Sequence, residues 1–343
     1  MSSRLPFTLG VLILAACGES VTPTQPEVRR DPAPVAVSLA AAPNTWTATA
    51  APPFTAYIYG YALGMAPNAA GQSIVYTFGG TSSDEGGTGI PVKAYNVATN
   101  SWTGRSSRVN VWYSNGVGKI GNKLYFSGGY NEHETPLSFS NQLWAYDYSS
   151  DRMIAKANLP IFAAEGVTGV ISGKLYVLPG ACSGDGYPNP GYCAMEPTRR
   201  FYRYDPATNS WVTRRQAPHF HRQGAAAVID GKFYVAGGYL NQSSDPTAAL
   251  DVYDPATNTW STLAPLPTGG AASGAALGGQ FYVVVSGFNG TTPYIRAYAY
   301  NPGTNQWRTR AAPDFFGSVT RVTLDGRAHL FMAGGNQSAL YTR

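Results

Sequence analysis

Short apolar runs that end in glycine recur along the chain, and this repetition dominates its pattern of hydrophobic and polar positions. Each run is rich in β-branched and aromatic residues. The six runs occupy residues 75–80 (V-Y-T-F-G-G), 124–129 (L-Y-F-S-G-G), 175–180 (L-Y-V-L-P-G), 233–238 (F-Y-V-A-G-G), 282–287 (Y-V-V-V-S-G) and 330–335 (L-F-M-A-G-G). Such a run predicts a buried strand that ends where the backbone turns sharply or approaches a neighbour closely.

A second phrase joins a tyrosine to a tryptophan through a turn built from Asp or Asn, Pro and Asn. It occupies residues 95–102 (Y-N-V-A-T-N-S-W), 204–211 (Y-D-P-A-T-N-S-W), 253–260 (Y-D-P-A-T-N-T-W) and 300–307 (Y-N-P-G-T-N-Q-W), with a degenerate copy at 146–153 (Y-D-Y-S-S-D-R-M). The phrase predicts a strand, a turn and a strand that opens on tryptophan. Upstream of most glycine runs, an apolar run with a Gly-containing turn, such as A-V-I-D-G-K at 227–232, predicts a hairpin.

Together these phrases define a unit of four antiparallel strands, which resembles the kelch repeat of β-propellers from roughly residue 44 to the C-terminus. The last glycine run has no tryptophan strand after it, whereas the stretch around Trp46 is a tryptophan strand with nothing before it. We therefore expect an all-β, six-bladed kelch-type β-propeller with four antiparallel strands per blade. The N-terminal strand around Trp46 would close the ring, as is common in kelch propellers, and would remove an exposed sheet edge.

Composition supports a turn-rich all-β fold, because the 343 residues include 39 Gly and 25 Pro and only 13% are charged. The net charge of +5 is modest for this length and is not gathered into basic clusters. We therefore expect no nucleic-acid partner.

The N-terminal residues have the pattern of a targeting segment. Arg4 precedes a ten-residue apolar stretch at 7–16 that is too short to span a bilayer. The sequence L-A-A-C at 14–17 resembles the lipobox of bacterial lipoproteins, which implies that Cys17 receives a lipid and becomes the mature N-terminus. An ordinary cleaved signal peptide with a chance cysteine is the alternative. Gly18 after the cysteine favours the outer membrane.

These features predict three segments and a location. We expect a signal peptide at 1–16, a lipid-anchored, disordered tether rich in Pro, Ala, Val and Thr at 17–43, and the propeller at 44–343. The expected location is the bacterial cell envelope, lipid-anchored at the outer membrane or cell surface, or secreted. The membrane would be contacted through the lipid anchor only.

Two further cysteines, Cys182 and Cys193, lie in the loop after the third glycine run. An exported protein meets oxidising conditions, so we expect a disulfide bond between them. Metal ligation is the alternative, but no histidine lies close in sequence.

Candidate binding residues fall in the loops after the glycine runs and at the entries to the inner strands, which meet at one face of a propeller. Variation between the repeats is concentrated on this face, so it is the default binding site. The candidates are Tyr57, Tyr59, Trp112, Tyr113, His133, Glu165, His221, Arg222 and Phe315. Aromatic side chains beside polar groups suit a sugar ring or a peptide. Packing of blade against blade is the alternative role for these aromatic residues.

Two pairs among these residues have chemical potential. Glu165 and Arg222 begin the inner strands of adjacent blades, where they would form an acid/base pair, a fork for a carboxylate, or a merely structural ion pair. His219 and His221 face the same side of a strand, as metal ligands do. Some kelch-type oxidases bind copper through Tyr and His, but they also need a Cys–Tyr crosslink near the axis. Here the propeller cysteines are expected to pair with each other, so we expect no metal site and no cofactor.

The sequence contains no nucleophile–base motif or phosphate loop. We therefore expect an envelope-anchored recognition module that binds a glycan or a protein. The alternative is an exported carbohydrate-active enzyme, since bacterial kelch propellers include sialic-acid mutarotases. Their catalytic residues cannot be carried over to this chain, because the matching residues lie in structural positions of the repeat.

Overall fold

The computed structural model describes residues 42–54, 60–80, 89–131, 138–182, 196–240 and 245–343, and all of them belong to the compact unit Pro34–Arg343. Tyr57, Tyr59, His133, Cys17 and Cys193 lie outside the described residues. Every regular element in the described part is a β-strand. Within the described residues there is no helix that is long and apolar enough to cross a membrane.

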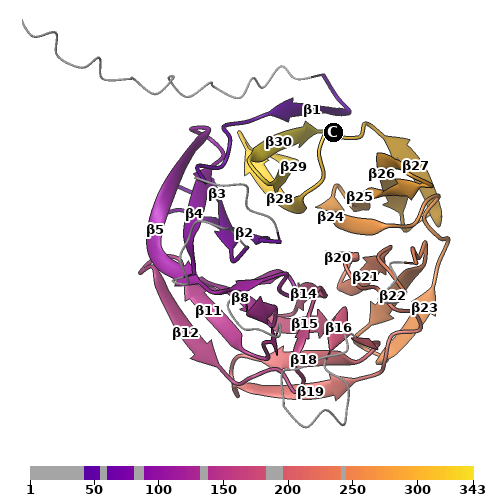
Figure 1. The fold of residues 1–343 in the computed structure, drawn as a ribbon, viewed down its shortest axis with the longest axis horizontal. Helices are drawn as coiled ribbons and strands as arrows, with labels where there is room; N and C mark the ends of the chain where they lie inside the picture. The colour runs from indigo at the N-terminus through magenta and orange to yellow at the C-terminus, as the bar shows by residue number, and fades with distance from the viewer. Residues whose placement is uncertain (1–41, 55–59, 81–88, 132–137, 183–195, 241–244) are drawn as a thin grey trace, which may run out of the picture. The chain divides into compact units, whose positions relative to one another are not determined.

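Six four-stranded antiparallel sheets surround a central axis as the blades of a propeller (Figure 1). Blades 1 to 3, from the inner to the outer strand, are β2 (Ala62–Pro67), β3 (Ser73–Phe78), β4 (Ile90–Asn96), β5 (Ser101–Val109); β7 (Val117–Ile120), β8 (Lys123–Ser127), β11 (Leu143–Asp147), β12 (Arg152–Lys156); and β14 (Val167–Ile171), β15 (Lys174–Leu178), β18 (Phe201–Asp205), β19 (Ser210–Arg214). Blades 4 to 6 are β20 (Ala225–Ile229), β21 (Lys232–Ala236), β22 (Leu250–Asp254), β23 (Thr259–Thr262); β24 (Ala271–Leu277), β25 (Gln280–Asn289), β26 (Thr292–Asn301), β27 (Gln306–Arg310); and β28 (Ser318–Leu324), β29 (Arg327–Gly334), β30 (Gln337–Thr342), β1 (Thr45–Ala48).

Two small three-stranded sheets adjoin blades 2 and 3. They consist of β6 (Val111–Trp112), β9 (Tyr130–Asn131), β10 (Ser138–Phe139), and of β13 (Ala163–Ala164), β16 (Ala181–Cys182), β17 (Glu196–Pro197). Each links the entry to a blade with the segment after that blade's glycine run. The sequence patterns did not indicate these two sheets.

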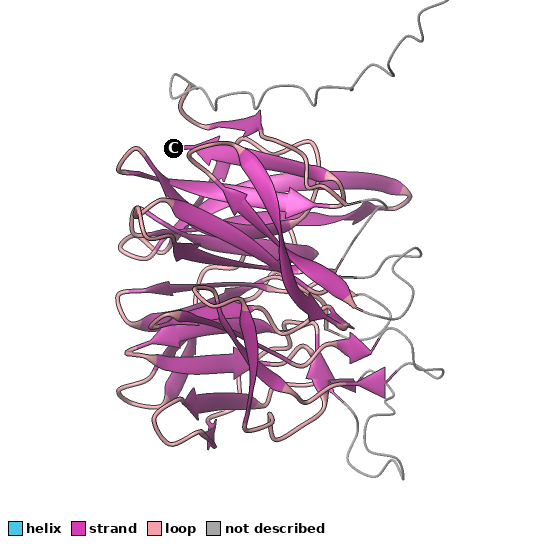
Figure 2. Ribbon diagram, turned by 90° about the vertical axis from the view of Figure 1, so that its left-hand side faces the viewer, coloured by secondary structure: helices cyan, strands magenta, loops and turns pink. Residues whose placement is uncertain are grey.

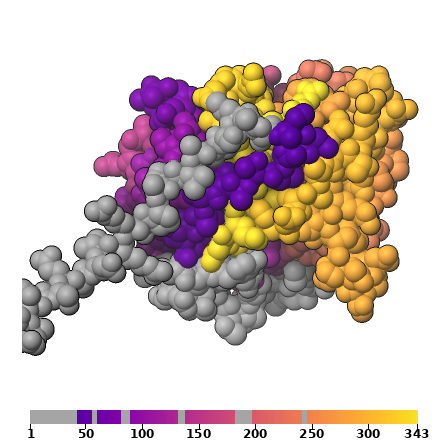
Figure 3. Space-filling model, turned by 90° about the horizontal axis from the view of Figure 1, so that it is seen from above, coloured from indigo at the N-terminus to yellow at the C-terminus, as the bar shows by residue number. Residues whose placement is uncertain are grey.

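The N-terminal strand closes the ring, which confirms the prediction. β1 is the outer strand of blade 6 and pairs antiparallel with β30, so that Trp46 lies opposite Tyr341. Their ring centroids are 5.2 Å apart, and the Trp46 indole nitrogen donates to the carbonyl of Ala311 in blade 5 at 2.9 Å. Figure 3 shows the indigo N-terminal residues lying against the yellow C-terminal blade.

The tyrosine and tryptophan of the repeat face each other on neighbouring strands. Tyr204 lies opposite Trp211 and Tyr253 opposite Trp260, and each tyrosine is fully buried. In the degenerate copy Tyr146 lies opposite Met153, so the methionine occupies the tryptophan position. The buried side chains pack mainly between adjacent blades, because the largest cluster contains residues from both blades 4 and 5. The repeat therefore encodes contacts between blades as well as the strands within them.

The last Asn of each turn holds two blades together. In blade 3 the Asn209 side-chain oxygen accepts a bond from Tyr204 Oη at 2.7 Å and one from the backbone N–H of Ala157, which follows the outer strand of blade 2, at 2.9 Å. The residues that make this double contact in the six blades are Asn100, Asp151, Asn209, Asn258, Asn305 and, for the closing blade, Asn44. All six have φ between 49° and 60°, a left-handed conformation that Asn and Asp tolerate better than most residues.

Glycine is required where the glycine runs meet the next blade. Gly79 and Gly128 have φ of 69° and 64°. A Cβ atom would collide with the carbonyl oxygen of Val111 at Gly79 and with that of Ala163 at Gly128. The close approach predicted for these glycines is therefore confirmed.

Candidate ligand-binding site

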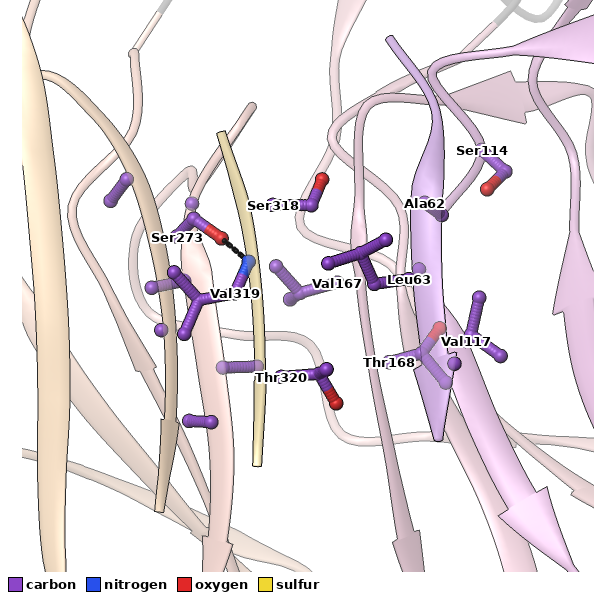
Figure 4. A pocket seen from close by; sticks show the side chains of 18 of the residues that line it. Ala62, Leu63, Ser114, Val117, Val167, Thr168, Ser273, Ser318, Val319 and Thr320 are labelled. Atoms are coloured by element: carbon purple, nitrogen blue, oxygen red, sulfur yellow. Dashed lines mark hydrogen bonds between the residues drawn. The ribbon is translucent and has the colours of Figure 1, made fainter. Parts of the chain in front are cut away.

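A cavity of about 810 Å³ runs along the axis of the ring. The inner strands of all six blades, β2, β7, β14, β20, β24 and β28, contribute residues to its wall (Figure 4). This volume lies within the range of roughly 300–1,000 Å³ that is typical of small-molecule sites.

The larger part of the cavity wall is apolar, few of its side chains are charged, and its polar groups come mainly from the backbone and from hydroxyl side chains. Each inner strand is the terminal strand of its sheet, so one of its edges has no strand partner in the described structure. Because the other edge pairs outward with the second strand, this edge presents N–H and C=O groups toward the axis. Hydroxyl side chains add to the wall, as with Ser273, whose Oγ accepts a bond from Val319 N at 2.8 Å (Figure 4).

One end of the cavity lies among the residues that lead into the inner strands, such as Gly60, Tyr113 and Gln223. We call this side of the propeller the loop face and this end of the cavity the mouth. The turns that carry Asn100, Asn209 and Asn258 lie at the opposite end of the strands, the turn face. A side view shows the short turns gathered along one side of the blades (Figure 2).

The mouth on the loop face is rimmed by a chain of backbone hydrogen bonds that passes from blade to blade. Tyr113 N donates to Gly60 O at 2.7 Å, and Glu165 N donates to Tyr113 O at 2.8 Å. Gln223 N then donates to Glu165 O at 2.8 Å, and Ala272 N to Gln223 O at 2.8 Å. The middle three residues have φ of 51°, 57° and 56°. The left-handed conformation lets each of them bond to the blade before and the blade after it.

The structure brings Glu165 and Arg222 together, as their positions at the start of adjacent inner strands indicated. Arg222 Nη1 lies 2.7 Å from Glu165 Oε2, and both side chains are only 5% exposed. The other carboxylate oxygen accepts a bond from Gln223 Nε2 at 2.7 Å. The guanidinium also lies over the ring of Tyr239, 5.3 Å from its centroid. Removing one partner of such a buried pair typically costs about 3–5 kcal/mol, so the pair also fixes the shape of the mouth.

His221 lies behind the mouth and is 1% exposed. Its Nδ1 lies 2.9 Å from the carbonyl oxygen of Gly237, and its Nε2 lies 3.1 Å from a carboxylate oxygen of Asp251. His219 Nδ1 contacts the same carboxylate at 3.0 Å, and Thr262 Oγ1 donates to it at 2.8 Å. The two histidines therefore face the same side, as predicted, but they bind a carboxylate of β22 instead of lining the cavity.

Asp251 is fully buried and was not identified from the sequence. Burial raises its pKa, but hydrogen bonds from His221, Thr262 and His219 together with the nearby imidazole charge outweigh burial and hold it below its ordinary value. The sequence does contain a signal for this residue, namely an acidic side chain at an inward-facing position of the strand L-D-V-Y-D (residues 250–254). No group of three or more His, Cys, Asp or Glu side chains in the described part of the chain could hold a metal ion.

The aromatic candidates divide between packing and the cavity. Trp112 packs on Tyr130 with ring centroids 5.3 Å apart, and Tyr113 lies 5.1 Å from Trp112. Only Tyr113 of these three lines the cavity. Phe315 is half-buried, and its neighbour Phe316 takes the place on the cavity wall.

The remaining candidates are not placed by the structure. Tyr57, Tyr59 and His133 fall outside the described residues, and so does Cys193, the expected partner of Cys182. The disulfide bond and these three contacts stay predictions.

Comparison with known proteins agrees with the architecture. Residues 119–335 match the model of the family described as the KLHDC2/KLHL20/DRC7 Kelch-repeats domain. A solved structure titled "Structure of YjhT" is similar over 85% of this chain and 97% of its own, with a TM-score of 0.65 and 15% sequence identity. At this identity the likeness concerns the fold alone. Because the family model matches more than half of the chain, the protein belongs to the kelch-repeat family.

Proposed function

We propose that the protein is a recognition module that takes part of a glycan or protein ligand into the axial cavity through the mouth on the loop face. The cavity of about 810 Å³ supports this function, because its size suits a sugar unit or a peptide end and its mouth carries aromatic and polar side chains. Propellers position variable loops on a rigid scaffold, and this suits binding.

A pair of matched variants tests the use of the cavity. Thr320 lines the cavity, and its side chain lies in the open space of Figure 4. Thr309 is exposed on the outer strand β27. Glycan and peptide arrays probed with the purified protein should give hits that Thr309→Phe retains and Thr320→Phe loses. Equal binding by the two variants would place the site elsewhere.

A second candidate function is an exported carbohydrate-active enzyme of the sialic-acid mutarotase type. The buried Glu165–Arg222 ion pair favours this candidate, since Glu165 lines the cavity and its carboxylate lies next to a cation. Magnetisation-exchange NMR would detect accelerated interconversion of sugar anomers. Glu165→Gln should abolish that acceleration, and an unaccelerated rate with the wild-type protein would eliminate this candidate.

The location is proposed from the sequence. The lipobox-like L-A-A-C at 14–17 supports lipidation of Cys17 and attachment to the cell envelope. Mass spectrometry of the protein from a bacterial membrane fraction should find a diacylglyceryl group on Cys17 and no free thiol at Cys182 or Cys193. Membrane association retained by Cys17→Ser would contradict the anchor, and two alkylatable thiols in the unreduced protein would contradict the disulfide.

A further inference from the structure

Three residues at the mouth keep a side chain where the backbone favours glycine. Tyr113, Glu165 and Gln223 have positive φ at the entries of blades 2, 3 and 4. In blade 1 the residue of the same hydrogen-bonded rim is Gly60, with φ of 74°. An L-residue is strained in this conformation and glycine is not. Strained residues of this kind concentrate at ligand-binding positions.

The three side chains differ in chemistry and share one location. They supply an aromatic ring, a carboxylate and an amide, and all three line the cavity. Glycine would serve the backbone equally well, as Gly60 does in blade 1, so the reason for these side chains lies in what they contact. Since they come from consecutive blades, they form one continuous arc of the rim.

The charge on this arc is already neutralised. Glu165 is paired with Arg222 at 2.7 Å, and Gln223 donates to its other oxygen. Each carboxylate oxygen has a second lone pair, which suits a hydroxyl donor. The Arg222 guanidinium is held between Glu165 and the ring of Tyr239, so an acidic ligand would approach the carboxylate first.

Two cationic side chains of the described cavity wall, Lys119 and Arg321, lie farther along their strands from this rim. Lys119 Nζ donates to the carbonyl of Gly121 in the hairpin turn at 2.9 Å, which directs this charge toward the turn face. Within the described residues, the rim therefore presents a ring face and hydrogen-bonding groups without net charge.

We infer that Tyr113, Glu165 and Gln223 are the specificity-determining residues of the mouth and that they select an uncharged, hydroxyl-rich ring, the chemistry of a neutral hexose unit. The Tyr113 ring stacks on the C–H face of the sugar, and the carboxylate and amide bond to its hydroxyls. This inference rests on the proposed function, because it names the ligand class of the same cavity.

The test uses the purified full-length protein and three methyl glycosides, of glucose, galactose and mannose, with N-acetylneuraminic acid as the acidic probe. Saturation-transfer NMR and calorimetry should show binding of at least one methyl glycoside and weaker binding of the acid. Tyr113→Gly and Gln223→Gly should each lower the affinity about tenfold or more, the loss expected for one good contact. Asn209→Gly is the matched control, since it also removes a side chain from a left-handed position, with φ of 50°, but on the turn face. The Asn209→Gly variant should bind the glycoside with the same affinity as the wild type.

The outcomes separate this inference from the proposed function. Preference for the acid, absence of binding by all three glycosides, or unchanged affinity in both mouth variants would overturn the inference. If a peptide bound and Thr320→Phe abolished that binding, the proposed function would stand and the sugar specificity would be wrong. If a glycoside bound equally to wild type and Thr320→Phe, the proposed use of the cavity itself would be wrong.

Discussion

The contact between blades made by the turn Asn offers a sharp test of how burial sets the strength of a hydrogen bond. Asn100 is 3% exposed, and its side-chain oxygen accepts from Tyr95 Oη at 2.6 Å and from Ala50 N at 2.8 Å. Asn209 makes the same two kinds of bond in blade 3 but is exposed. The chemistry is matched, and only the burial differs.

The magnitudes follow from what each substitution leaves behind. Asn100→Ala leaves the buried Tyr95 hydroxyl and the partly buried Ala50 N–H without this acceptor, at about 1.5 kcal/mol each. Alanine at φ of 49° adds about 1 kcal/mol. We therefore expect Asn100→Ala to lower the free energy of unfolding by about 4 kcal/mol. For Asn209→Ala water replaces the lost partner, and we expect a loss of about 2 kcal/mol.

Urea titration followed by tryptophan fluorescence and far-UV circular dichroism would measure both values. The glycine variants at the same positions separate strain from bonding, because glycine adopts positive φ freely. Each should be more stable than its alanine counterpart by about 1 kcal/mol. Equal losses for Asn100→Ala and Asn209→Ala, or glycine variants no more stable than the alanine variants, would refute the reasoning.

Three further predictions concern closure, pH and packing. Trp46→Ala and Trp260→Ala should lower the free energy of unfolding by similar amounts, about 2–4 kcal/mol. Each indole is half-buried, its ring centroid lies 5.2 Å from that of its tyrosine, and its N–H donates to a backbone carbonyl of the preceding blade. A urea midpoint of Trp46→Ala equal to that of the wild type would contradict closure by β1. The pKa of Asp251 is lowered from 3.8 in the folded protein, so its carboxylate stabilises the protein above about pH 4, and this contribution is lost as the pH falls through the lower folded-state pKa. The difference in free energy of unfolding between wild type and Asp251→Asn should therefore be constant near neutrality and shrink below pH 4. A difference that grew on acidification would contradict this sign. Gly169→Val should lower the free energy of unfolding by about 1–3 kcal/mol, since a Cβ atom at this position would lie 2.6 Å from the Phe233 ring. An unchanged melting temperature would show that blades 3 and 4 can move apart to accommodate the side chain.

The repeat made the architecture predictable, because each phrase joins a local turn signal to a contact with the next blade. The position of Trp46 was sufficient to predict that the first strand belongs to the last blade. The degenerate copy was placed correctly although Met153 replaces tryptophan, since spacing and the tyrosine were retained. The meeting of Glu165 and Arg222 also followed from their equivalent positions in adjacent repeats.

The mouth was only partly predictable, because its geometry arises from contacts around the ring. Tyr, Glu and Gln have no intrinsic preference for positive φ, and Tyr113 and Gln223 adopt it because backbone bonds to two neighbouring blades require it. Asp251 was missed for a related reason, since its histidine partners come from a loop about thirty residues earlier. His221 lay near the mouth in sequence terms, yet those bonds turn its ring into the interior.

The pairing of β1 with β30 has a consequence for the order in which the protein is made. Tyr341 and Asn44, which are hydrogen-bonded at 2.9 Å, are 297 residues apart in the chain. The first described strand of the propeller is therefore the last to find its partner, while blades 1 to 5 are assembled from strands that are neighbours in sequence. Long-range contacts of this kind form slowly, so we expect ring closure to be the late step of folding and blade 6 to be the point where a protease meets the incomplete protein. Because β1 and β30 are neighbouring strands of blade 6, proteolytic cleavage of either one would disrupt the same blade.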